Sequence, residues 1–545
     1  MFKAALRYIS WLWRNAKGTR RKIAVNILLG WLSICLNLAF IWVSKTLVDI
    51  ATKDRAGTIS GFAALLIILL FARVAVNAFN SRLENITFAK MNFLIRKRQY
   101  SNLLQAQWQG KEKMHTGDTL NRLFSDVDKV VSMICQELPS VIMTCFQLAA
   151  AFIFLGAMNL YLALVILLIT PALFLFSKVF FKKMRKLTKD IRETESQVQS
   201  HIQESLQHKT TIQSLEQGRN MEDQLSDLQD TEFRQILRRT RFNIFSRTVV
   251  SLAFNFGYVA ALLWGVIGIS KGTMTFGMLT AFLQLVGQIQ GPSMRLLRQI
   301  PEFAYATASI DRISELEDAP KEEQGKSVQL EGKCGIRFDG LSFRYPDGTE
   351  DVLHDFSFDF KPGSRTAIVG ETGVGKSTMI KLILSLLRPV DGKISIYNEN
   401  GMSVEASPLT RINLVYVPQG NTLFSGTIRD NLLMGDPQAS DEQMFQALGT
   451  AAAEFVKELP DGLDTKCGEQ GSGLSEGQAQ RIAIARGLLR PGKIMLLDEF
   501  SSSLDNQTEE RLITNLTKGN DDKTMIFITH REKISEYCDQ VLRLS

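Results

Sequence analysis

The first half of the chain contains long stretches with almost no Asp, Glu, Lys or Arg, and these stretches restrict its fold more than any other feature. A helix needs about 20 mostly apolar residues to cross the hydrocarbon core of a bilayer. Core helices of a soluble protein this long usually carry a charged face. We therefore expect an α-helical transmembrane domain with six spans. The spans lie at 23–44, at 56–79 (interrupted by Arg73), at 138–177 as two spans joined by a turn at 156–159, at 248–270 and at 272–294.

The distribution of Lys and Arg predicts the orientation of these helices. The segments before residue 23, at 82–137 and at 178–247 are rich in basic residues, whereas the opposite loops are short. Basic loops stay on the cytoplasmic side of a membrane. Both chain ends, both long loops and the whole second half are therefore predicted to be cytoplasmic. We expect an integral protein of the bacterial inner (cell) membrane.

The predicted cytoplasmic segments have features of their own. Apolar residues recur at helical spacing between basic ones near the start of the chain, at Phe2, Leu6, Ile9 and Trp13. This spacing predicts a helix that lies on the inner leaflet and contacts membrane lipid. Each long loop is predicted to form two helices that extend the spans by about 40 Å. Gly117 and Gly218 mark the expected turns between those helices.

The composition excludes several classes of protein. A formal net charge of +7 over 545 residues is too mild for a nucleic-acid-binding surface, so no nucleic acid is expected as a partner. Basic loops do suit an anionic membrane surface. The six cysteines show no close pairing and no Cys-x-x-Cys spacing, which argues against a disulfide framework and a structural zinc site.

The composition changes around residues 318–333, where Asp318, Ala319 and Pro320 precede a run of charged residues. Such a run is typical of a linker. We expect a transmembrane domain at 1–318, a linker at 319–333 and a second domain at 334–545. In the second domain, short β-rich runs alternate with helical patterns, which predicts an α/β fold.

A phosphate-binding loop lies in the second domain. The segment 364–370 has the pattern of a buried strand, 370–377 fits G-x-x-x-x-G-K-[ST], and a helical pattern follows. The glycines let backbone N–H groups close around phosphate oxygens, and the helix N-terminus adds partial positive charge. Lys376 is expected to reach the β- and γ-phosphates, and Ser377 to offer its hydroxyl to Mg²⁺. The predicted nucleotide-binding residues are Gly370, Glu371, Thr372, Gly373, Val374, Gly375, Lys376, Ser377 and Thr378.

A second acidic element is expected on a neighbouring buried strand. The apolar run 494–497 ends in Asp498 and Glu499. Asp498 would hold Mg²⁺, directly or through water, and Glu499 would orient or deprotonate the attacking water. On its own, this short pattern is more typical of a plain strand end. Together with the loop, it predicts a site that binds a nucleotide with Mg²⁺ and hydrolyses it.

The segment 336–544 resembles the nucleotide-binding domain of ATP-binding-cassette (ABC) transporters. With the six preceding spans, the chain resembles a type I exporter half-transporter. The resemblance implies that Tyr345 stacks on adenine, that Gln419 senses Mg²⁺, and that His530 is a switch near the γ-phosphate. It also implies that the segment 474–478 (Leu-Ser-Glu-Gly-Gln) is the family signature and that Asp505 belongs to the loop after the catalytic glutamate. The implied catalytic residues are Glu499, His530 and Gln419, and the implied Mg²⁺ contacts are Ser377, Gln419 and Asp498.

The signature also has a physical basis within one chain. Ser475 and Gln478 have the spacing of a capping box that opens a helix. A helix start with the Ser475 hydroxyl and the Gly477 N–H can bind an anion, and a capped structural helix is the alternative. In the family, this segment meets the phosphate loop only across a dimer. The third signature position is usually glycine, and we expect the carboxylate of Glu476 to point away from phosphate.

Three further segments resemble exporters more than importers, and the membrane domain is fused to the second domain. These segments are 114–127, 423–428 and 468–471. One phosphate loop, one signature and six spans are half of the family's usual set, so the resemblance implies a dimer. A homodimer is the simpler arrangement, and a second half-transporter is the other possible partner. The expected function is ATP-driven export by alternating access. The alternative is a membrane-tethered ATPase with a regulatory or sensing role and no transport.

Polar residues inside the spans bear on the substrate. Ionisable groups in a span are functional candidates. Lys45 and Asp49 are four residues apart, so they could instead pair near the outer interface, and Arg73 could snorkel or pair across helices. A cavity lined by such groups would be amphipathic and partly basic, which suits a lipid-like molecule, a hydrophobic drug or a peptide. The polar residues are Lys45, Asp49, Arg73, Asn77, Gln147, Asn255, Gln284 and Gln288.

Overall fold

The computed structural model describes the chain in two compact units. The first unit comprises Met1–Ser101 and Thr116–Glu317, and the second comprises Asn102–His115 and Asp318–Ser545. The residues that the structure describes are 2–107, 116–158, 160–346, 348, 350–371, 373–468, 473–518 and 522–544.

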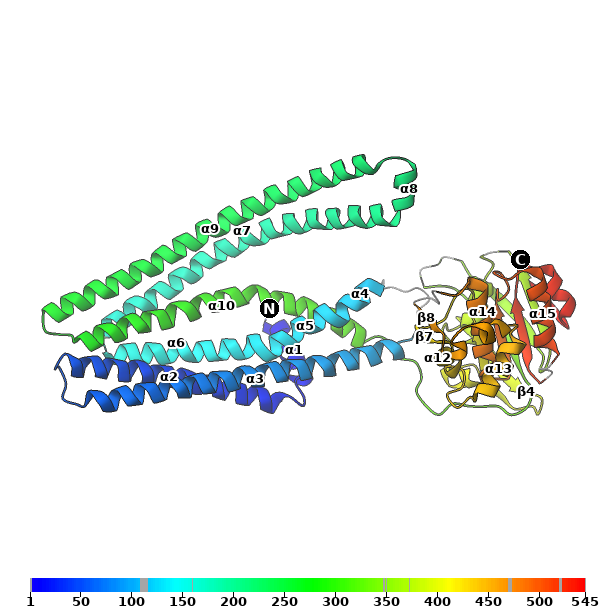
Figure 1. Ribbon diagram of the computed structural model, residues 1–545, viewed down its shortest axis with the longest axis horizontal. Helices are drawn as coiled ribbons and strands as arrows, with labels where there is room; N and C mark the ends of the chain where they lie inside the picture. Colours follow the sequence, from blue (N-terminus) through cyan, green and yellow to red (C-terminus); the bar gives the residue numbers. More distant parts are fainter. Residues whose placement is uncertain are drawn as a thin grey trace. The chain divides into compact units, whose positions relative to one another are not determined.

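The first unit is helical (Figure 1). Its helices are α1 (Phe2–Asn15), α2 (Arg20–Ala51), α3 (Ile59–Gln105), α4 (Thr116–Asn121), α5 (Val127–Ser132), α6 (Leu138–Met158), α7 (Leu160–Gln207), α8 (Lys209–Ser214), α9 (Gly218–Ser270) and α10 (Phe276–Glu317). At 1.5 Å per residue, α9 is about 80 Å long, far more than a bilayer core of about 30 Å. The long helices therefore extend well beyond their apolar segments, as expected.

The apolar segments agree with the predicted spans where the structure describes them. Among the described residues, three helices are long and apolar enough to cross a membrane, namely Arg20–Ala51, Ile59–Gln105 and Gly117–Met158. The fourth and fifth predicted spans lie within α7 and α9, and the sixth, at 272–294, overlaps α10, which begins four residues later at Phe276. Asn159, in the predicted turn between the third and fourth spans, lies outside the described residues.

The turns at the ends of the long loops differ in detail from the prediction. Gly117 lies inside α4, one residue after the helix begins, so it is not a turn residue. Gly218 is the first residue of α9, and the connection before it contains the short helix α8. Figure 1 shows α7 and α9 side by side, with α8 at their junction. The turn in the second loop lies at 215–217, directly before Gly218, and residues 108–115 before Gly117 lie outside the described residues.

The helix α1 packs on one side and is exposed on the other. Trp11 and Leu12 belong to a buried apolar cluster that also includes residues of α5 and α10, among them Val130 and Ile310. Trp13 is 63% exposed, with the Arg20 guanidinium 4.6 Å from the centre of its ring. An amphipathic aromatic ring beside a cation suits the membrane–water interface, in line with the predicted interfacial helix.

The helix that leads into α6 contains two π-helical turns. The π turns η1 (Arg122–Asp126) and η2 (Met133–Glu137) separate α4 from α5 and α5 from α6 without a break in the helix. A π turn holds one residue more than an α turn needs and is frequent at functional sites. In this helix, η1 carries two charged residues, Arg122 and Asp126, that face the end of α10.

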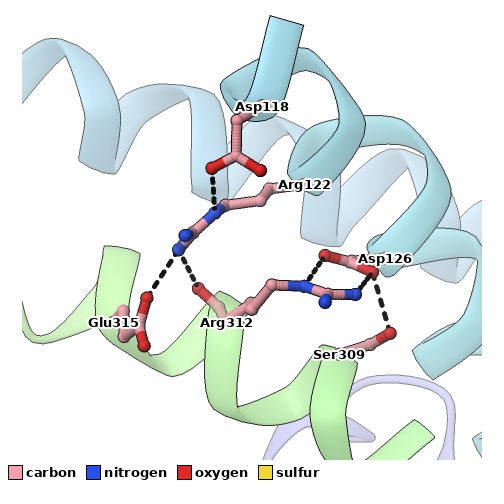
Figure 2. Close-up of polar contacts among 6 residues, drawn as sticks. All are labelled: Asp118, Arg122, Asp126, Ser309, Arg312 and Glu315. Atoms are coloured by element: carbon pink, nitrogen blue, oxygen red, sulfur yellow. Dashed lines mark hydrogen bonds and ion pairs between the residues drawn. The ribbon is translucent and has the colours of Figure 1, made fainter. Parts of the chain in front are cut away.

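Two arginines tie η1 to α10, as Figure 2 shows. Arg312 donates to both carboxylate oxygens of Asp126, at 2.7 and 2.5 Å, and the hydroxyl of Ser309 donates to the same carboxylate at 2.8 Å. Arg122 donates to Asp118 at 2.9 Å and to Glu315 at 2.7 Å. The Asp126 side chain is fully buried, whereas those of Asp118 and Glu315 are 43% and 62% exposed. The six residues of Figure 2 are called the α10 clasp below.

Asp49, one of the polar residues inside the spans, contacts another helix, and no ion pair with Lys45 is found among the described residues. Oδ1 of Asp49 instead accepts a hydrogen bond from the backbone N–H of Gly277 at 3.0 Å. Gly277 lies at the start of α10, where backbone N–H groups have no partner within the helix. A carboxylate is favoured there by hydrogen bonding and by the helix dipole, so Asp49 caps a helix that is distant in sequence. Arg73, in contrast, does contact a neighbouring helix, through Asn37 of α2.

The second unit contains two larger sheets. A four-stranded antiparallel sheet has the order β2-β1-β4-β5, and a five-stranded parallel sheet has the order β11-β3-β10-β9-β6. The strands are β1 (Cys334–Phe343), β2 (Leu353–Phe360), β3 (Arg365–Gly370), β4 (Asp391–Asn398), β5 (Ser403–Glu405), β6 (Leu414–Val417), β7 (Gly426–Thr427), β8 (Lys466–Cys467), β9 (Ile494–Asp498), β10 (Thr524–Ile528) and β11 (Gln540–Leu544). The helices are α11 (Lys376–Ile383), α12 (Ile428–Leu433), α13 (Asp441–Thr450), α14 (Glu476–Leu489) and α15 (Asn506–Thr517).

The parallel sheet explains where the predicted site lies. β9 and β10 are wholly buried, and the middle of β3 is buried too, which suits their continuous apolar sequences. The strands are parallel, so the residues that follow β3, β9 and β10 meet at one edge of the sheet. The acidic strand β9 was expected to neighbour β3 directly, but β10 lies between them.

The expected linker is ordered by contacts within the second unit. The backbone N–H of Gln107 donates to the carbonyl oxygen of Pro320 at 2.7 Å, and that of Glu322 donates to Gln105 at 2.9 Å. The carboxylate of Glu322 also accepts two hydrogen bonds from Arg411, both at 2.7 Å. The start of the linker is therefore held by the end of α3 and by the second domain.

Candidate nucleotide-binding site

The predicted phosphate loop lies between β3 and α11. β3 ends at Gly370 and α11 begins at Lys376. Gly373 and Gly375 have φ angles of +95° and +106°, a region that residues with a side chain rarely adopt. The glycines therefore permit the sharp turn that such a loop needs. The loop ends at the N-terminus of α11, where the helix dipole favours an anion.

Lys376 is folded into this loop. Its side chain is only 6% exposed, and its ammonium group donates to the carbonyl oxygens of Gly370 at 2.5 Å and Glu371 at 3.2 Å. Burial lowers the pKa of Lys376, and the charges of Glu499 and Asp498 act in the opposite direction. A phosphate oxygen would be a stronger partner for this buried charge than a neutral carbonyl oxygen. The position of Lys376 thus suits the predicted role.

Tyr345 lies beside the same helix. Its ring packs edge-on against Phe343 with the ring centres 5.0 Å apart, and its hydroxyl lies 3.0 Å from Oγ1 of Thr378. Ser377 is exposed, so its hydroxyl is accessible. The structure therefore brings Tyr345, Ser377 and Thr378 together around the loop. Thr372, which was predicted to bind nucleotide, lies outside the described residues.

Glu499 joins two other predicted catalytic residues. Nε2 of Gln419 donates to one of its carboxylate oxygens at 2.6 Å, and the other oxygen lies 2.8 Å from Nε2 of His530. Nε2 of His530 is in turn 3.3 Å from Nζ of Lys376. Four residues from distant parts of the sequence therefore form one connected group at the edge of the parallel sheet.

The backbone of Glu499 is strained. Its φ angle is +44°, and a residue with a side chain in this region costs about 1–3 kcal/mol. Its N–H still donates to the carbonyl oxygen of Ile528 at 2.9 Å, so the residue stays attached to β10. Backbone strain of this kind persists where the surroundings fix the geometry, often at functional sites.

Asp498 is buried at the end of β9. It is 7% exposed, and the hydroxyl of Tyr416 donates to its carboxylate at 3.3 Å. Burial raises the pKa of Asp498, and the neighbouring charge of Glu499 raises it too, against the hydrogen bond from Tyr416. A buried carboxylate with one neutral hydrogen-bond donor is costly, and a cation beside it would relieve that cost.

The oxygen groups near the loop fit Mg²⁺. Mg²⁺ prefers oxygen ligands and is usually bound through one or two protein groups plus substrate phosphates. The hydroxyl of Ser377, the amide oxygen of Gln419 and the carboxylate of Asp498 are such oxygen groups. In the part of the chain that the structure describes, no group of three or more His, Cys, Asp or Glu residues could hold a metal ion. Bound nucleotide would supply further oxygen ligands through its phosphates.

The predicted capping box is confirmed. The hydroxyl of Ser475 accepts a hydrogen bond from the N–H of Gln478 at 3.2 Å, and the Gln478 side chain accepts one from the N–H of Ser475 at 2.9 Å. α14 begins directly after Ser475, and Glu476 is exposed. A Cβ on Gly477 would come within 2.9 Å of the carbonyl oxygen of Ser503, so only glycine fits without a shift. Within the described part of the chain, the signature residues thus contact one another and 503–504.

Asp505 also has a structural role. One carboxylate oxygen accepts a hydrogen bond from the N–H of Thr508 at 2.9 Å, and the other accepts one from the Thr508 hydroxyl at 2.7 Å. These bonds lower the pKa of Asp505 and cap the N-terminus of α15. The same carboxylate therefore holds the loop after Glu499 in place.

Sequence reasoning missed residues that support the site from behind. Tyr416 holds Asp498, and Nε2 of Gln480 donates to the carbonyl oxygen of Pro418 at 3.2 Å, next to Gln419. The only sequence signal for Tyr416 is an aromatic residue at an outward position of a short strand, a pattern that many strands without a functional role share. Met114, His115 and residues 469–471 of the exporter-like segments lie outside the described residues.

Comparison with known proteins supports the fold and shows the family of this chain. A family model described as the ABC transporter transmembrane region matches residues 23–293, and a model described as ABC transporter matches residues 353–502. A Staphylococcus aureus protein named for multidrug export as an ATP-binding/permease protein is 30% identical over 482 residues, covering 88% of this chain and 83% of the relative. A multidrug resistance ABC transporter ATP-binding and permease protein of Lactococcus lactis is 28% identical over 542 residues, covering 97% and 89%.

A solved structure has the same fold over nearly the whole chain. The structure of a bacterial Atm1-family ABC exporter with ATP bound has a TM-score of 0.81 and 23% identity, covering 97% of this chain and 94% of that one. The predicted fold class, a helical transmembrane domain followed by an ABC ATPase domain, is therefore confirmed. The prediction of an ATP hydrolase coupled to transport is confirmed by the same matches. The chain belongs to the ABC transporter family, as an exporter that carries its membrane-spanning and ATP-hydrolysing parts on one polypeptide.

Proposed function

We propose that the chain exports an amphipathic or hydrophobic substrate, such as a lipid-like molecule, a drug or a peptide, by alternating access in a dimer. The observation that carries this proposal is the connected group of Lys376, Glu499, Gln419 and His530 at the end of the parallel sheet. In a chain that also holds long apolar helices, such a group couples ATP hydrolysis to a change in a membrane domain. Named relatives include multidrug exporters, which favours a substrate of this type.

The proposed dimer follows from what one chain lacks. Within a chain, Ser475, Gly477 and Gln478 contact one another and 503–504, so an ATP at the phosphate loop would meet a signature only from a second copy. Exporter half-transporters generally dimerise, and a homodimer is the simpler arrangement here. To change an inward-facing population from 99:1 to 1:99, ATP must favour the closed state by about 5.5 kcal/mol. Several charge-assisted hydrogen bonds to each of two nucleotides are enough for that difference.

Each residue of the site has a proposed role. Lys376 binds the β- and γ-phosphates, Tyr345 stacks on adenine, and Glu499 accepts a proton from the attacking water. Gln419 and His530 orient the Glu499 carboxylate from opposite sides. Bound Mg²⁺, held through Ser377, Gln419 and Asp498, would neutralise charge on the phosphates. Asp505 positions the loop after Glu499.

We propose that the chain is organised as two domains joined by a linker. The transmembrane domain ends near residue 318, a linker follows at 319–333, and the nucleotide-binding domain extends from residue 334. The chain is an integral membrane protein, and we place it in the bacterial inner membrane with the nucleotide-binding domain in the cytoplasm. The strong bias of Lys and Arg towards one side of the apolar segments supports this orientation.

The test compares ATP hydrolysis with transport in reconstituted vesicles. Glu499→Gln keeps the shape of the side chain but removes the base, so we expect ATPase activity and substrate movement to fall together by at least about a hundredfold. Glu510→Gln is the matched control, because Glu510 makes an ion pair with Lys533 on the surface. If amphiphiles neither stimulate the ATPase nor move across the vesicle, a regulatory or sensing ATPase would replace the exporter.

A further inference from the structure

The apolar helices α2 and α3 are joined by polar contacts that the ATP cycle does not use. Nη1 of Arg73 on α3 donates to Oδ1 of Asn37 on α2 at 2.6 Å. The hydroxyl of Ser33 on α2 donates to Oδ1 of Asn77 on α3 at 2.6 Å. The residues on each helix are four apart, so the two contacts lie one turn from each other on facing sides. These four residues are called the polar ladder below.

The polar ladder lies at the depth of the hydrocarbon core. Arg73 lies nine residues before Arg82, and Asn37 lies fifteen residues after Lys22, which are the flanking basic residues on the cytoplasmic side. At 1.5 Å per residue these separations are about 14 and 22 Å, within a core of about 30 Å. Helical side chains point towards the N-terminus of their helix, which on α3 is the direction away from the cytoplasm. The guanidinium group of Arg73 therefore reaches into the membrane and not back to the cytoplasmic surface.

Arg73 has a neutral partner only. Asn37 offers an amide oxygen, and among the described residues no carboxylate forms an ion pair with Arg73. A charge at this depth without a counter-ion is costly and marks a functional site by default. The polar face continues with Asn26 on α2, which is 3% exposed and has no partner for either amide atom within the described residues. On α3, the buried carbonyl oxygen of Asn80 also lacks a described partner.

The surface around Arg73 suits the apolar part of a ligand. Leu69 and Leu70, four and three residues before Arg73, share its face of α3, where Leu69 is half-buried and Leu70 is 44% exposed in a single chain. A molecule entering from the lipid could lay its hydrocarbon part along these side chains while its polar end reaches Arg73. An arginine offers two parallel N–H donors to an anionic oxygen group, which an amide side chain cannot match.

We infer that Arg73, oriented by Asn37, binds the anionic head group of an amphipathic substrate. The inference rests on the proposed export function and narrows its substrate class to amphiphiles that end in a carboxylate or phosphate. Ser33 and Asn77 contribute further hydrogen bonds to the same head group. Binding of the anion supplies the counter-ion that the helices themselves lack, so the site favours anionic over neutral or cationic amphiphiles.

The experiment varies only the charge of the head group. Oleate, oleyl alcohol and oleylamine share one hydrocarbon chain and are added to the full chain in phosphatidylcholine vesicles. We expect oleate to stimulate the ATPase at the lowest concentration. Arg73→Gln should raise the half-stimulating concentration of oleate by roughly ten- to a hundredfold, as the loss of a charge-assisted hydrogen bond implies. Arg73→Lys keeps the charge and should retain part of the response.

Two further variants control for the loss of a positive charge and for the orientation of Arg73. Arg82→Gln removes the same charge from the same helix, but nine residues at about 100° each place Arg82 on the opposite face of α3. Arg82 is exposed, and its variant should respond to oleate like the wild type. Asn37→Ala leaves the charge and removes only its orientation, so its loss should be smaller than that of Arg73→Gln.

The outcomes separate this inference from the export proposal. If the wild type responds to oleate and Arg73→Gln responds equally well, the inference is wrong and export stands. Equal stimulation by oleate, oleyl alcohol and oleylamine would also show that the inference is wrong while export stands. Loss of the dimer in Arg73→Gln, seen by size-exclusion chromatography, would show that Arg73 pairs with a second chain and would also overturn the inference. If no amphiphile affects the wild type, the export proposal fails together with it.

Discussion

The α10 clasp permits a quantitative prediction, because its two arginines pair with carboxylates of very different burial. Arg312→Gln would leave the fully buried carboxylate of Asp126 with Ser309 as its remaining side-chain partner. Breaking a buried ion pair by removing one partner costs about 3–5 kcal/mol. Arg122→Gln leaves no buried carboxylate unpaired: the Arg122 side chain is 12% exposed, but its two carboxylate partners are 43% and 62% exposed, and pairs with exposed partners contribute only about 0.2–1 kcal/mol. Two substitutions of the same kind, a few ångströms apart, should therefore differ severalfold in free energy.

Amide hydrogen exchange of the reconstituted chain measures this difference locally. At about 1.4 kcal/mol per factor of ten, Arg312→Gln should speed exchange in η1 and at the end of α10 by roughly two to three orders of magnitude. Arg122→Gln should change exchange there by less than about tenfold. The double variant Asp126→Asn/Arg312→Gln contains no unpaired buried charge and should recover most of the protection.

Two results would refute this reasoning. Equal exchange in the two single variants would mean that burial of the carboxylate does not set the cost. A double variant that exchanges as fast as Arg312→Gln would mean that the loss comes from packing of the arginine stem and not from the stranded charge. Arg312→Lys keeps the charge but loses the two-point contact, so its exchange should lie between those of Gln and the wild type.

Further predictions concern the nucleotide-binding domain. The pKa of Asp498 is higher in the folded chain than in the unfolded chain. The ionised carboxylate therefore destabilises the fold at a pH above the folded pKa, and this cost disappears at a pH below the unfolded pKa. Asp498→Asn should therefore raise the thermal midpoint of the nucleotide-free chain at pH 7, with the gain shrinking as the pH falls towards 4. Ser475→Ala should lower the midpoint by about 2–4 °C through loss of the cap, with Ser475→Gly less affected in a parallel melting experiment. Gly477→Ala should lower ATPase activity more than Gly449→Ala, because only the former meets a backbone oxygen; equal activities would contradict the close contact.

The elements that could be predicted from the sequence are those whose geometry is local. The phosphate loop is determined by a few consecutive residues, and the capping box of Ser475 and Gln478 by four. Both lie where the sequence placed them. The apolar length of α2, α3 and α6 likewise follows from composition alone. In each case the physical cause, either backbone flexibility or the thickness of a bilayer, acts within one segment.

The elements that could not be predicted depend on distant partners. No short pattern shows that β10 lies between β3 and β9, so the contact of Glu499 with His530 emerges only from the assembled sheet. The pairing of Lys45 with Asp49 looked favourable on one helix, but the N-terminus of α10 competes for the same carboxylate. The roles assigned to the catalytic residues, and the signature above all, involve a nucleotide and a second chain, which are outside the reach of one sequence.

The two π turns between α4 and α6 have a consequence for how this helix tolerates insertions and deletions. Each π turn shifts the helix phase by roughly one residue, or about 100°, relative to an uninterrupted α-helix. Deleting one residue from η1 would restore α-helical winding locally but rotate everything before it, moving Arg122 to another side. The helix would remain continuous, but Arg122 would no longer face Glu315. The extra residue in each π turn therefore determines which direction the preceding side chains face, more than it determines the stability of the helix.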